Sequence, residues 1–281
     1  MGSVEIAFVR EQDARGEVES VFADIRAVMR IGTVNLIWRH LAMDAAVLQA
    51  AWAVARPLYV RREALEQAVA DTVVRLGRPD LTPWSDDAWA DAGLAYDDRR
   101  RIAGVIATYN RGNAFNLLAL SALLAPAGGK NHDRSEPRDV DALLPPPPSD
   151  LPSVPELHEL EPGVAELVTR LNGLGLRRPA GGIVATLYKH LALWPGMLNL
   201  TWSLLEPLER SHTLVALVEQ CAACSADAAG SLAAEVGRWE RDDLRERAQA
   251  SISLFVDSAI CRMLPVGLLL RDALNEGGPP P

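Results

Sequence analysis

The chain has 281 residues and a formal net charge of −9, and it carries no basic stripe, so we expect no nucleic-acid partner. Ala and Leu dominate and long β-branched runs are absent, which favours an all-α protein. Charges close to the start exclude the apolar region of a signal peptide, and no uninterrupted apolar run reaches the roughly 18 residues of a membrane span. We therefore expect a cytoplasmic protein with no membrane partner.

Helical periodicity marks most of the first half of the chain. Apolar residues recur at helical spacing, and Gly or Pro residues separate the predicted helices: 16–29, a helix through 39–58, 61–76, a short helix after Ser85, and 98–124. The segment 30–34 contains Gly32 and breaks the first helix from the second. Pro57 predicts a kink or the start of a new helix, because proline removes a helical hydrogen bond.

A Pro-rich stretch, 126–162, divides the chain. Four consecutive prolines at 145–148 favour an extended polyproline conformation and exclude a helix there. The stretch is long for a loop in a compact domain, so we expect a strap that joins two units over the outside. After it, helices are predicted from 164, through 189–208, over 212–237 and over 244–274, with a break at 177–182.

An internal repeat relates the two halves. Without a gap, 39–58 and 189–208 share seven identical residues in twenty, at an offset of 150. A repeat of this kind determines the architecture, so it has to be recognised first. We predict two tandem helical repeats packed as an intramolecular pseudo-dimer: first repeat 1–125, Pro-rich linker 126–162, second repeat 163–276 and tail 277–281. A shared pocket at the junction is the expected site.

One face of the helix 98–124 carries polar residues that the second half lacks. Tyr109, Asn113 and Asn116 lie at i, i+4 and i+7, so they share a helix face. Their counterparts 150 residues later are apolar: Ala259, Met263 and Val266. A constraint of the fold common to both halves would not need polarity in only one, so this face is the predicted polar wall of the pocket. The alternative is that the amides satisfy backbone groups at a kink near Gly112.

His40 and His190 occupy equivalent positions of the repeat. A residue that recurs in both halves more often packs or hydrogen-bonds between helices than binds a ligand. No carboxylate stands nearby at ligand spacing, so we expect no metal. Among the tryptophans, Trp38 and Trp194 do not recur and could reach the pocket.

Cys221 and Cys224 form the one C-x-x-C motif of the chain. On a helix this spacing can lower the pKa of one thiol and permit redox cycling. The segment faintly resembles the alkylhydroperoxidase-like pattern, which needs a His where Ala228 stands. The alternative is that both cysteines are small packing residues.

Several segments resemble the group I 2-haloacid dehalogenases, which act on D- or DL-2-haloalkanoic acids. The resemblance covers most of the chain at low identity, and its most specific parts are Asn-x-Gly-Asn, which here begins at Asn110, and the Leu-Ala-x-Trp-Pro segment at 191–195. It implies an all-α fold of two fused helical repeats, and a helical Asp that activates water while an Asn assists. The Asn matches Asn113, whereas the Asp position holds Leu187.

The neighbouring positions also depart from the family pattern. Thr186 and Tyr188 fall where the family has a Ser-Asp-Phe run around the Asp, and its aromatic pocket residues fall on Thr33 and Leu36. A general base typically supplies about 10²- to 10⁴-fold in rate, so the family's hydrolytic mechanism is not expected to survive its loss. Asp257 or Asp44 would have to replace it.

These observations lead to one functional hypothesis and two alternatives. We predict a small-molecule enzyme that acts on a small organic acid or related metabolite, without a cofactor or metal and with a homodimer possible. Helix N-termini would hold a carboxylate. The alternatives are a non-catalytic binding protein on the same scaffold and a C-x-x-C thiol oxidoreductase. The predicted catalytic residues are Asn113, Tyr109 and Thr186, and the predicted substrate-binding residues are Thr33, Leu36, Asn116, Leu187 and Tyr188.

Overall fold

The computed structural model describes residues 5–126, 139–145 and 151–274. The described part contains helices and loops and no strand, which confirms the all-α prediction. The helices are α1 (Gly16–Met29), α2 (Leu36–Leu41), α3 (Ala45–Arg61), α4 (Glu63–Arg75), α5 (Asp86–Asp91), α6 (Tyr96–Leu124), α7 (Val140–Leu143), α8 (Pro162–Asn172), α9 (Thr186–Leu191), α10 (Pro195–Arg210), α11 (Thr213–Leu232), α12 (Asp242–Phe255) and α13 (Cys261–Leu274). A π-helical turn, η3 (Val256–Ile260), joins α12 to α13, and two short 3-10 turns are η1 (Glu11–Asp13) and η2 (Leu157–Glu159).

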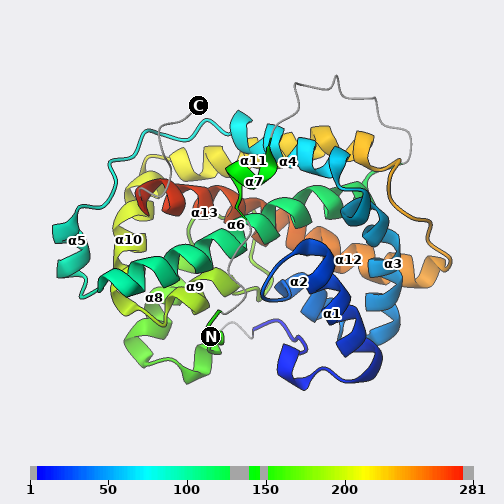
Figure 1. Cartoon of the computed structure of the whole chain (residues 1–281), viewed down its shortest axis with the longest axis horizontal. Coiled ribbons are helices and arrows are strands. Elements are labelled where there is room, and N and C mark those ends of the chain that lie inside the picture. The colour runs from blue at the N-terminus through cyan, green and yellow to red at the C-terminus, as the bar shows by residue number, and fades with distance from the viewer. Residues whose placement is uncertain (1–4, 127–138, 146–150, 275–281) are drawn as a thin grey trace.

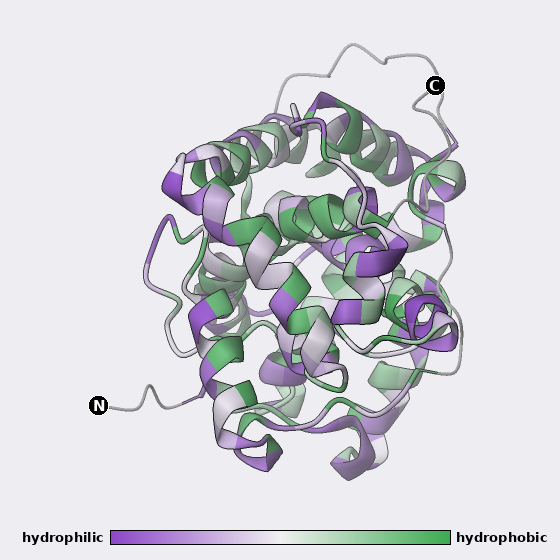
Figure 2. Cartoon of the chain, turned by 90° about the vertical axis from the view of Figure 1, so that its left-hand side faces the viewer, coloured by the Kyte–Doolittle hydropathy of each residue, from purple (hydrophilic) through white to green (hydrophobic). Residues whose placement is uncertain are grey.

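Helix α6 is the centre of the molecule. It packs against α13, α11 and α4, with α1–α3 on one side and α8–α10 on the other (Figure 1). Almost every residue from Ile102 to Leu123 is buried, so this helix is apolar on most of its circumference rather than along one stripe. Figure 2 shows hydrophobic residues along the helix at the centre and more hydrophilic residues along the outer helices.

The elements of the two halves follow the same order. Helix α2 spans 36–41 and α9 spans 186–191, and α3 and α10 begin at 45 and 195. Each of these bounds recurs at an offset of 150. This spacing agrees with a duplicated unit.

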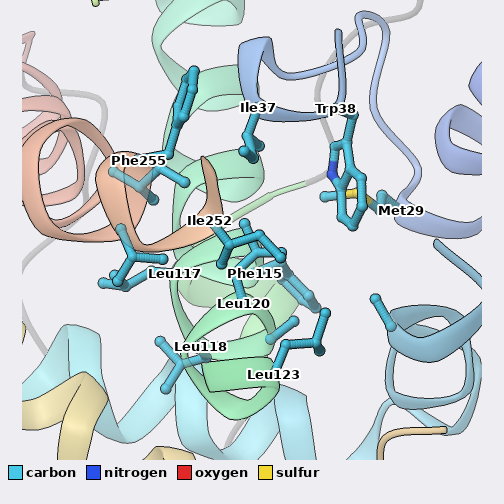
Figure 3. Packing of buried hydrophobic residues seen from close by; sticks show 14 of the residues in the cluster. Met29, Ile37, Trp38, Phe115, Leu117, Leu118, Leu120, Leu123, Ile252 and Phe255 are labelled. Carbon is cyan, nitrogen blue, oxygen red and sulfur yellow. The ribbon is translucent and has the colours of Figure 1, made fainter. Parts of the chain in front are cut away.

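Two apolar clusters meet along α6. The residues 114–123 of α6 pack with α1–α4 and α12, whereas its residues 102–109 pack with α8–α10 and α13. Figure 3 shows the first cluster, in which Phe115 and Leu120 of α6 lie near Ile252 of α12. The polar residues 110–113 of α6 therefore lie between the two clusters.

The periodicity of residues 39–58 predicts one helix, and this prediction is wrong: the stretch belongs to two helices, α2 and α3. Helix α2 ends at Leu41, and Asp44 begins α3 by accepting hydrogen bonds from the backbone N–H groups of Ala46 and Val47 at 2.9 and 3.2 Å. Such N-caps stabilise a helix start by about 1 kcal/mol, enough to place the boundary. Pro57 lies inside α3 and starts no new helix.

Part of the Pro-rich linker is folded onto the protein. Helix α7 packs against α4, and the fully buried Arg111 of α6 donates from Nη1 to Asp141 Oδ1 and to the Leu144 carbonyl oxygen, both at 2.7 Å. These bonds fix the described start of the linker to the central helix. Residues 146–148 of the proline run and the predicted tail at 277–281 lie outside the described residues.

One helical stretch within the described ranges, 242–274, has the length and hydropathy that a membrane-spanning helix needs. Of its apolar window, 83% is buried inside the protein. A buried window is typical of a core helix, and this stretch is the second long helix of the core.

Candidate functional site

A small cavity lies where the N-terminal ends of α2 and α9 meet α6 and the η3 turn. Its volume is about 40 Å³. One water molecule needs about 10–15 Å³ on the same scale, so the cavity has room for a ligand of a few heavy atoms. No charged side chain is among the described residues that form its wall. They are Asn35, Leu36, Ile37, Tyr109, Asn113, Asn116, Ile183, Ala185, Thr186, Leu187, Phe255, Ala259, Ile260 and Met263.

The polar wall of the cavity comes from α6. Tyr109, Asn113 and Asn116 all line it, as their helical spacing predicts. The residue Asn113 is 9% exposed, and its side chain forms no hydrogen bond with any residue that the structure describes. The Oδ1 and Nδ2 atoms of this carboxamide are not among the fully buried polar atoms without a partner, so the carboxamide keeps some accessible surface. It is therefore available to a ligand in the cavity.

Asn116 also accepts two hydrogen bonds in the core. Its Oδ1 accepts hydrogen bonds from Trp38 Nε1 at 2.9 Å and from the Tyr59 hydroxyl at 2.8 Å. Its Nδ2 is buried and has no partner in the described part of the chain. Trp38 thus contacts a residue of the cavity wall without lining the cavity itself.

A second wall of the cavity comes from two segments that lie 150 residues apart in the sequence. Residues 35–37 at the start of α2 and 185–187 at the start of α9 both line the cavity, and they are related by the offset of 150. Leu187 is 1% exposed and stands on this wall together with Leu36 and Thr186. An alkyl group thus occupies the position at which the family resemblance expects a carboxylate.

Tyr109 lies in the wall between the cavity and a second, larger space. Its hydroxyl lies 3.2 Å from Nδ1 of His190, and the two rings pack edge to face. Burial raises the pKa of Tyr109 and lowers the pKa of His190 to about 4, so both side chains are neutral near pH 7. His190 in turn lines an outer cleft of about 460 Å³.

Two predicted site residues lie elsewhere. Thr33 lines the outer cleft, where its hydroxyl donates to Glu11 Oε1 at 2.6 Å. Tyr188 points into the apolar cluster around α8–α10, and burial raises its pKa to about 12. The ring of Tyr188 packs in that cluster, and Tyr188 is not among the residues that line the cavity.

The other candidates do not form part of this cavity. Asp44 caps α3, and Asp257 pairs with Arg178 at 3.1 Å. Cys221 and Cys224 are buried, and burial raises the pKa of both thiols, which is opposite to what a reactive thiolate needs. Within the described ranges, no group of three or more His, Cys, Asp and Glu residues could hold a metal ion.

Asn35 is the polar wall residue that the sequence analysis missed. It precedes α2, lines the cavity, and its buried Oδ1 has no partner among the described residues. Its amide also packs against the backbone of Gly112, where an added Cβ would lie 2.7 Å from Asn35 Nδ2. Asn35 directly precedes Leu36, a predicted substrate-binding residue, and this position in the sequence could have identified it as part of the site.

No protein-family model matches the chain, and no curated protein matches its sequence. Similar solved structures include a mutant D-2-haloacid dehalogenase in complex with D-2-CPA, with a TM-score of 0.73 and 20% identity over 97% of this chain and 96% of that one. They also include D-2-haloacid dehalogenase with L-LA (TM-score 0.72, 21% identity, 98% and 96% coverage) and another mutant of a D-2-haloacid dehalogenase (0.69, 21%, 98% and 94%). The chain therefore has the all-α fold of the D-2-haloacid dehalogenases over nearly its whole length.

Proposed function

We propose that the protein is a small-molecule enzyme that binds a small organic acid in the cavity between the two halves. The fold supports an enzyme of dehalogenase-like type, and the small volume of the cavity supports a substrate of a few heavy atoms. The observation that carries the proposal is the side chain of Asn113, which faces the cavity without a hydrogen bond to any described residue.

We infer that the two halves are copies of one unit and that the cavity lies on the axis relating them. The wall residues support this, because 35–37 and 185–187 are equivalent, and Tyr109 and Asn113 are equivalent to Ala259 and Met263. On a two-fold axis equivalent surfaces meet, and divergence of the copies makes one wall polar and the other apolar.

In this proposal, uncharged hydrogen-bond donors bind the carboxylate of the organic-acid substrate. Helices α2 and α9 both begin at the cavity, and neither has a side-chain hydrogen bond that caps its N-terminus. Free backbone N–H groups of a first turn favour an anion. The amides of Asn113 and Asn116 add N–H donors beside them, since Asn116 Nδ2 has no partner in the described chain.

The chemistry differs from hydrolysis by an activated water in this proposal. The described wall offers no carboxylate, and Leu187 occupies the place of the expected Asp. Thr186, Tyr109 and Asn113 supply hydrogen bonds instead of a base. An alternative is a binding protein without catalysis, which is favoured by the absence of any charged side chain from the described wall.

Halide release from D- and L-2-chloropropionate tests the enzymatic part. We expect slow turnover or none in the wild type, and any turnover present is lost in Asn113→Ala. Turnover that equals the wild type in Asn113→Ala would contradict the proposed site. Absence of turnover together with binding that depends on Asn113 would favour the binding protein, or an enzyme of different chemistry.

A further inference from the structure

The outer cleft is a second space large enough for a ligand. It has a volume of about 460 Å³ and lies among the N-terminal segment, the loop before α2 and residues 151–159. His190 lines this cleft, and its hydrogen-bond partner Tyr109 lines the inner cavity. The Tyr109–His190 pair therefore belongs to the wall shared by the two spaces.

Arg39 presents a fixed guanidinium to the cleft. The residue is 7% exposed, its Nε donates to the Val9 carbonyl oxygen at 3.2 Å, and its guanidinium carbon lies 4.3 Å from the centre of the Phe8 ring. The two contacts hold the planar group in one orientation. Its two Nη atoms form no hydrogen bond with any described residue.

The charge of Arg39 is only partly compensated. The nearest carboxylate is that of Glu156, whose Oε1 lies 4.0 Å from Arg39 Nη2, beyond hydrogen-bond distance. The other oxygen of Glu156 accepts from the buried Lys189 Nζ at 2.8 Å. Burial also lowers the pKa of Arg39, although the negative charges of Glu11 and Glu156 act to raise it.

The other carboxylates of the cleft are engaged. Glu11 pairs with Arg26 at 2.6 Å and accepts from Thr33, and Glu159 accepts from the backbone N–H of Glu156 at 2.8 Å. Neither forms an ion pair with Arg39 in the described structure. A buried guanidinium with an open edge matches a carboxylate, because its paired N–H groups fit the two oxygens.

We propose that the outer cleft is a binding site for a small carboxylate, which the Nη edge of Arg39 holds in bidentate fashion. The site is distinct from the inner cavity, from which the Tyr109–His190 pair separates it. It does not depend on the proposed function, although a carboxylate bound there lies next to the wall of the inner cavity.

The test uses 2-bromopropionate, because bromine can be located by anomalous scattering. Crystals of the full chain grown with this anion are expected to show bromine in the outer cleft with the carboxylate at hydrogen-bond distance from Arg39 Nη. The same position is expected in Asn113→Ala and absent in Arg39→Met. A wild type without bromine in the outer cleft, or an Arg39→Met variant that keeps it, would overturn the proposal.

Calorimetric titration of the same anion measures the site in solution. Arg39→Met is expected to weaken the outer site by about tenfold or more, since hydrogen bonds to a charged group are lost. Arg39→Lys is a second variant in case Arg39→Met misfolds. It keeps the positive charge but not the paired N–H groups of the guanidinium, so it should still bind the anion more weakly than the wild type. Wild-type affinity in Arg39→Lys would overturn the bidentate site. Bromine in the outer cleft without bromine in the inner cavity would leave this proposal standing and count against the proposed function.

Discussion

Asn113 of α6 and Leu187 of α9 line the same small cavity from different halves of the chain. The first is an amide without a hydrogen-bond partner in the described structure, and the second is an alkyl group that is 1% exposed. A polar group to which the proposal assigns binding thus lines the same cavity as the position where a catalytic carboxylate would be expected from the family resemblance. The pair suggests which single substitution would restore hydrolysis.

Leu187→Asp is expected to introduce hydrolysis of 2-haloacids. The new carboxyl group enters an apolar wall, so burial will raise its pKa and the activity should increase with pH as it ionises. The same desolvation should reduce the free energy of unfolding at neutral pH by about 1–3 kcal/mol. Halide release as a function of pH measures the first effect and urea unfolding the second.

Leu187→Asn is the matched control, because it has nearly the same shape as Asp but cannot ionise. It should lose a similar amount of stability and gain no hydrolysis. Equal halide release from the Asp and Asn variants would mean that position 187 does not face the reacting carbon.

Asn116→Ala is expected to destabilise the fold rather than only the site. It removes the acceptor shared by the buried Trp38 Nε1 and the Tyr59 hydroxyl. Each unsatisfied buried donor costs about 1–3 kcal/mol, so the loss of both bonds should lower the free energy of unfolding by about 2–6 kcal/mol. Chemical denaturation measures it, and a loss below 1 kcal/mol would show that the two donors find other partners.

Part of the site follows from the spacing of residues in the sequence. Helical spacing brings Tyr109, Asn113 and Asn116 onto one face, and this relation does not depend on loop conformation. Leu36, Thr186 and Leu187 were predicted from the family resemblance, and they also line the cavity. The all-α fold follows from composition and spacing.

The remainder of the site depends on geometry that periodicity does not contain. The contribution of Phe255 depends on how α12 crosses α6, and that of Ile183 depends on the loop before α9. The prediction that Tyr188 binds substrate was wrong because its ring packs in the apolar cluster of α8–α10 and not in the cavity wall. The break between α2 and α3 was missed although Asp44 is a favoured N-cap residue.

His190 is expected to make stability depend on pH in the acid range. Its pKa in the folded protein is about 4, below its ordinary value of 6.5, so the unfolded chain binds the proton more readily. Stability is therefore retained above pH 6.5 and falls as the pH decreases towards 4, by up to about 3 kcal/mol. The free energy of unfolding measured from pH 7 to pH 4 should fall more steeply in the wild type than in His190→Gln. Identical slopes would show that His190 does not contribute.

Changing Cys221 and Cys224 together to Ser is expected to leave ligand binding and any turnover unchanged. Both thiols are buried and burial raises the pKa of each, so little thiolate forms near pH 7. Native protein should accordingly react slowly with a disulfide reagent and rapidly after unfolding. Fast labelling of the native protein, or loss of activity in the double variant, would favour the thiol oxidoreductase.

The most direct test of the inner cavity is the dissociation constant of 2-chloropropionate in a chain that carries Arg39→Met, so that the proposed outer site does not contribute; it is measured for this chain alone and with Asn113→Ala or Asn199→Ala added. Asn199 is an exposed residue of α10 and serves as the matched control. Because Asn113 has no hydrogen bond to lose within the described structure, its variant should keep the wild-type stability within about 1 kcal/mol. We predict that Asn113→Ala raises the dissociation constant about tenfold whereas Asn199→Ala leaves it unchanged. Equal affinity of all three proteins would contradict the claim that the cavity beside Asn113 is the binding site.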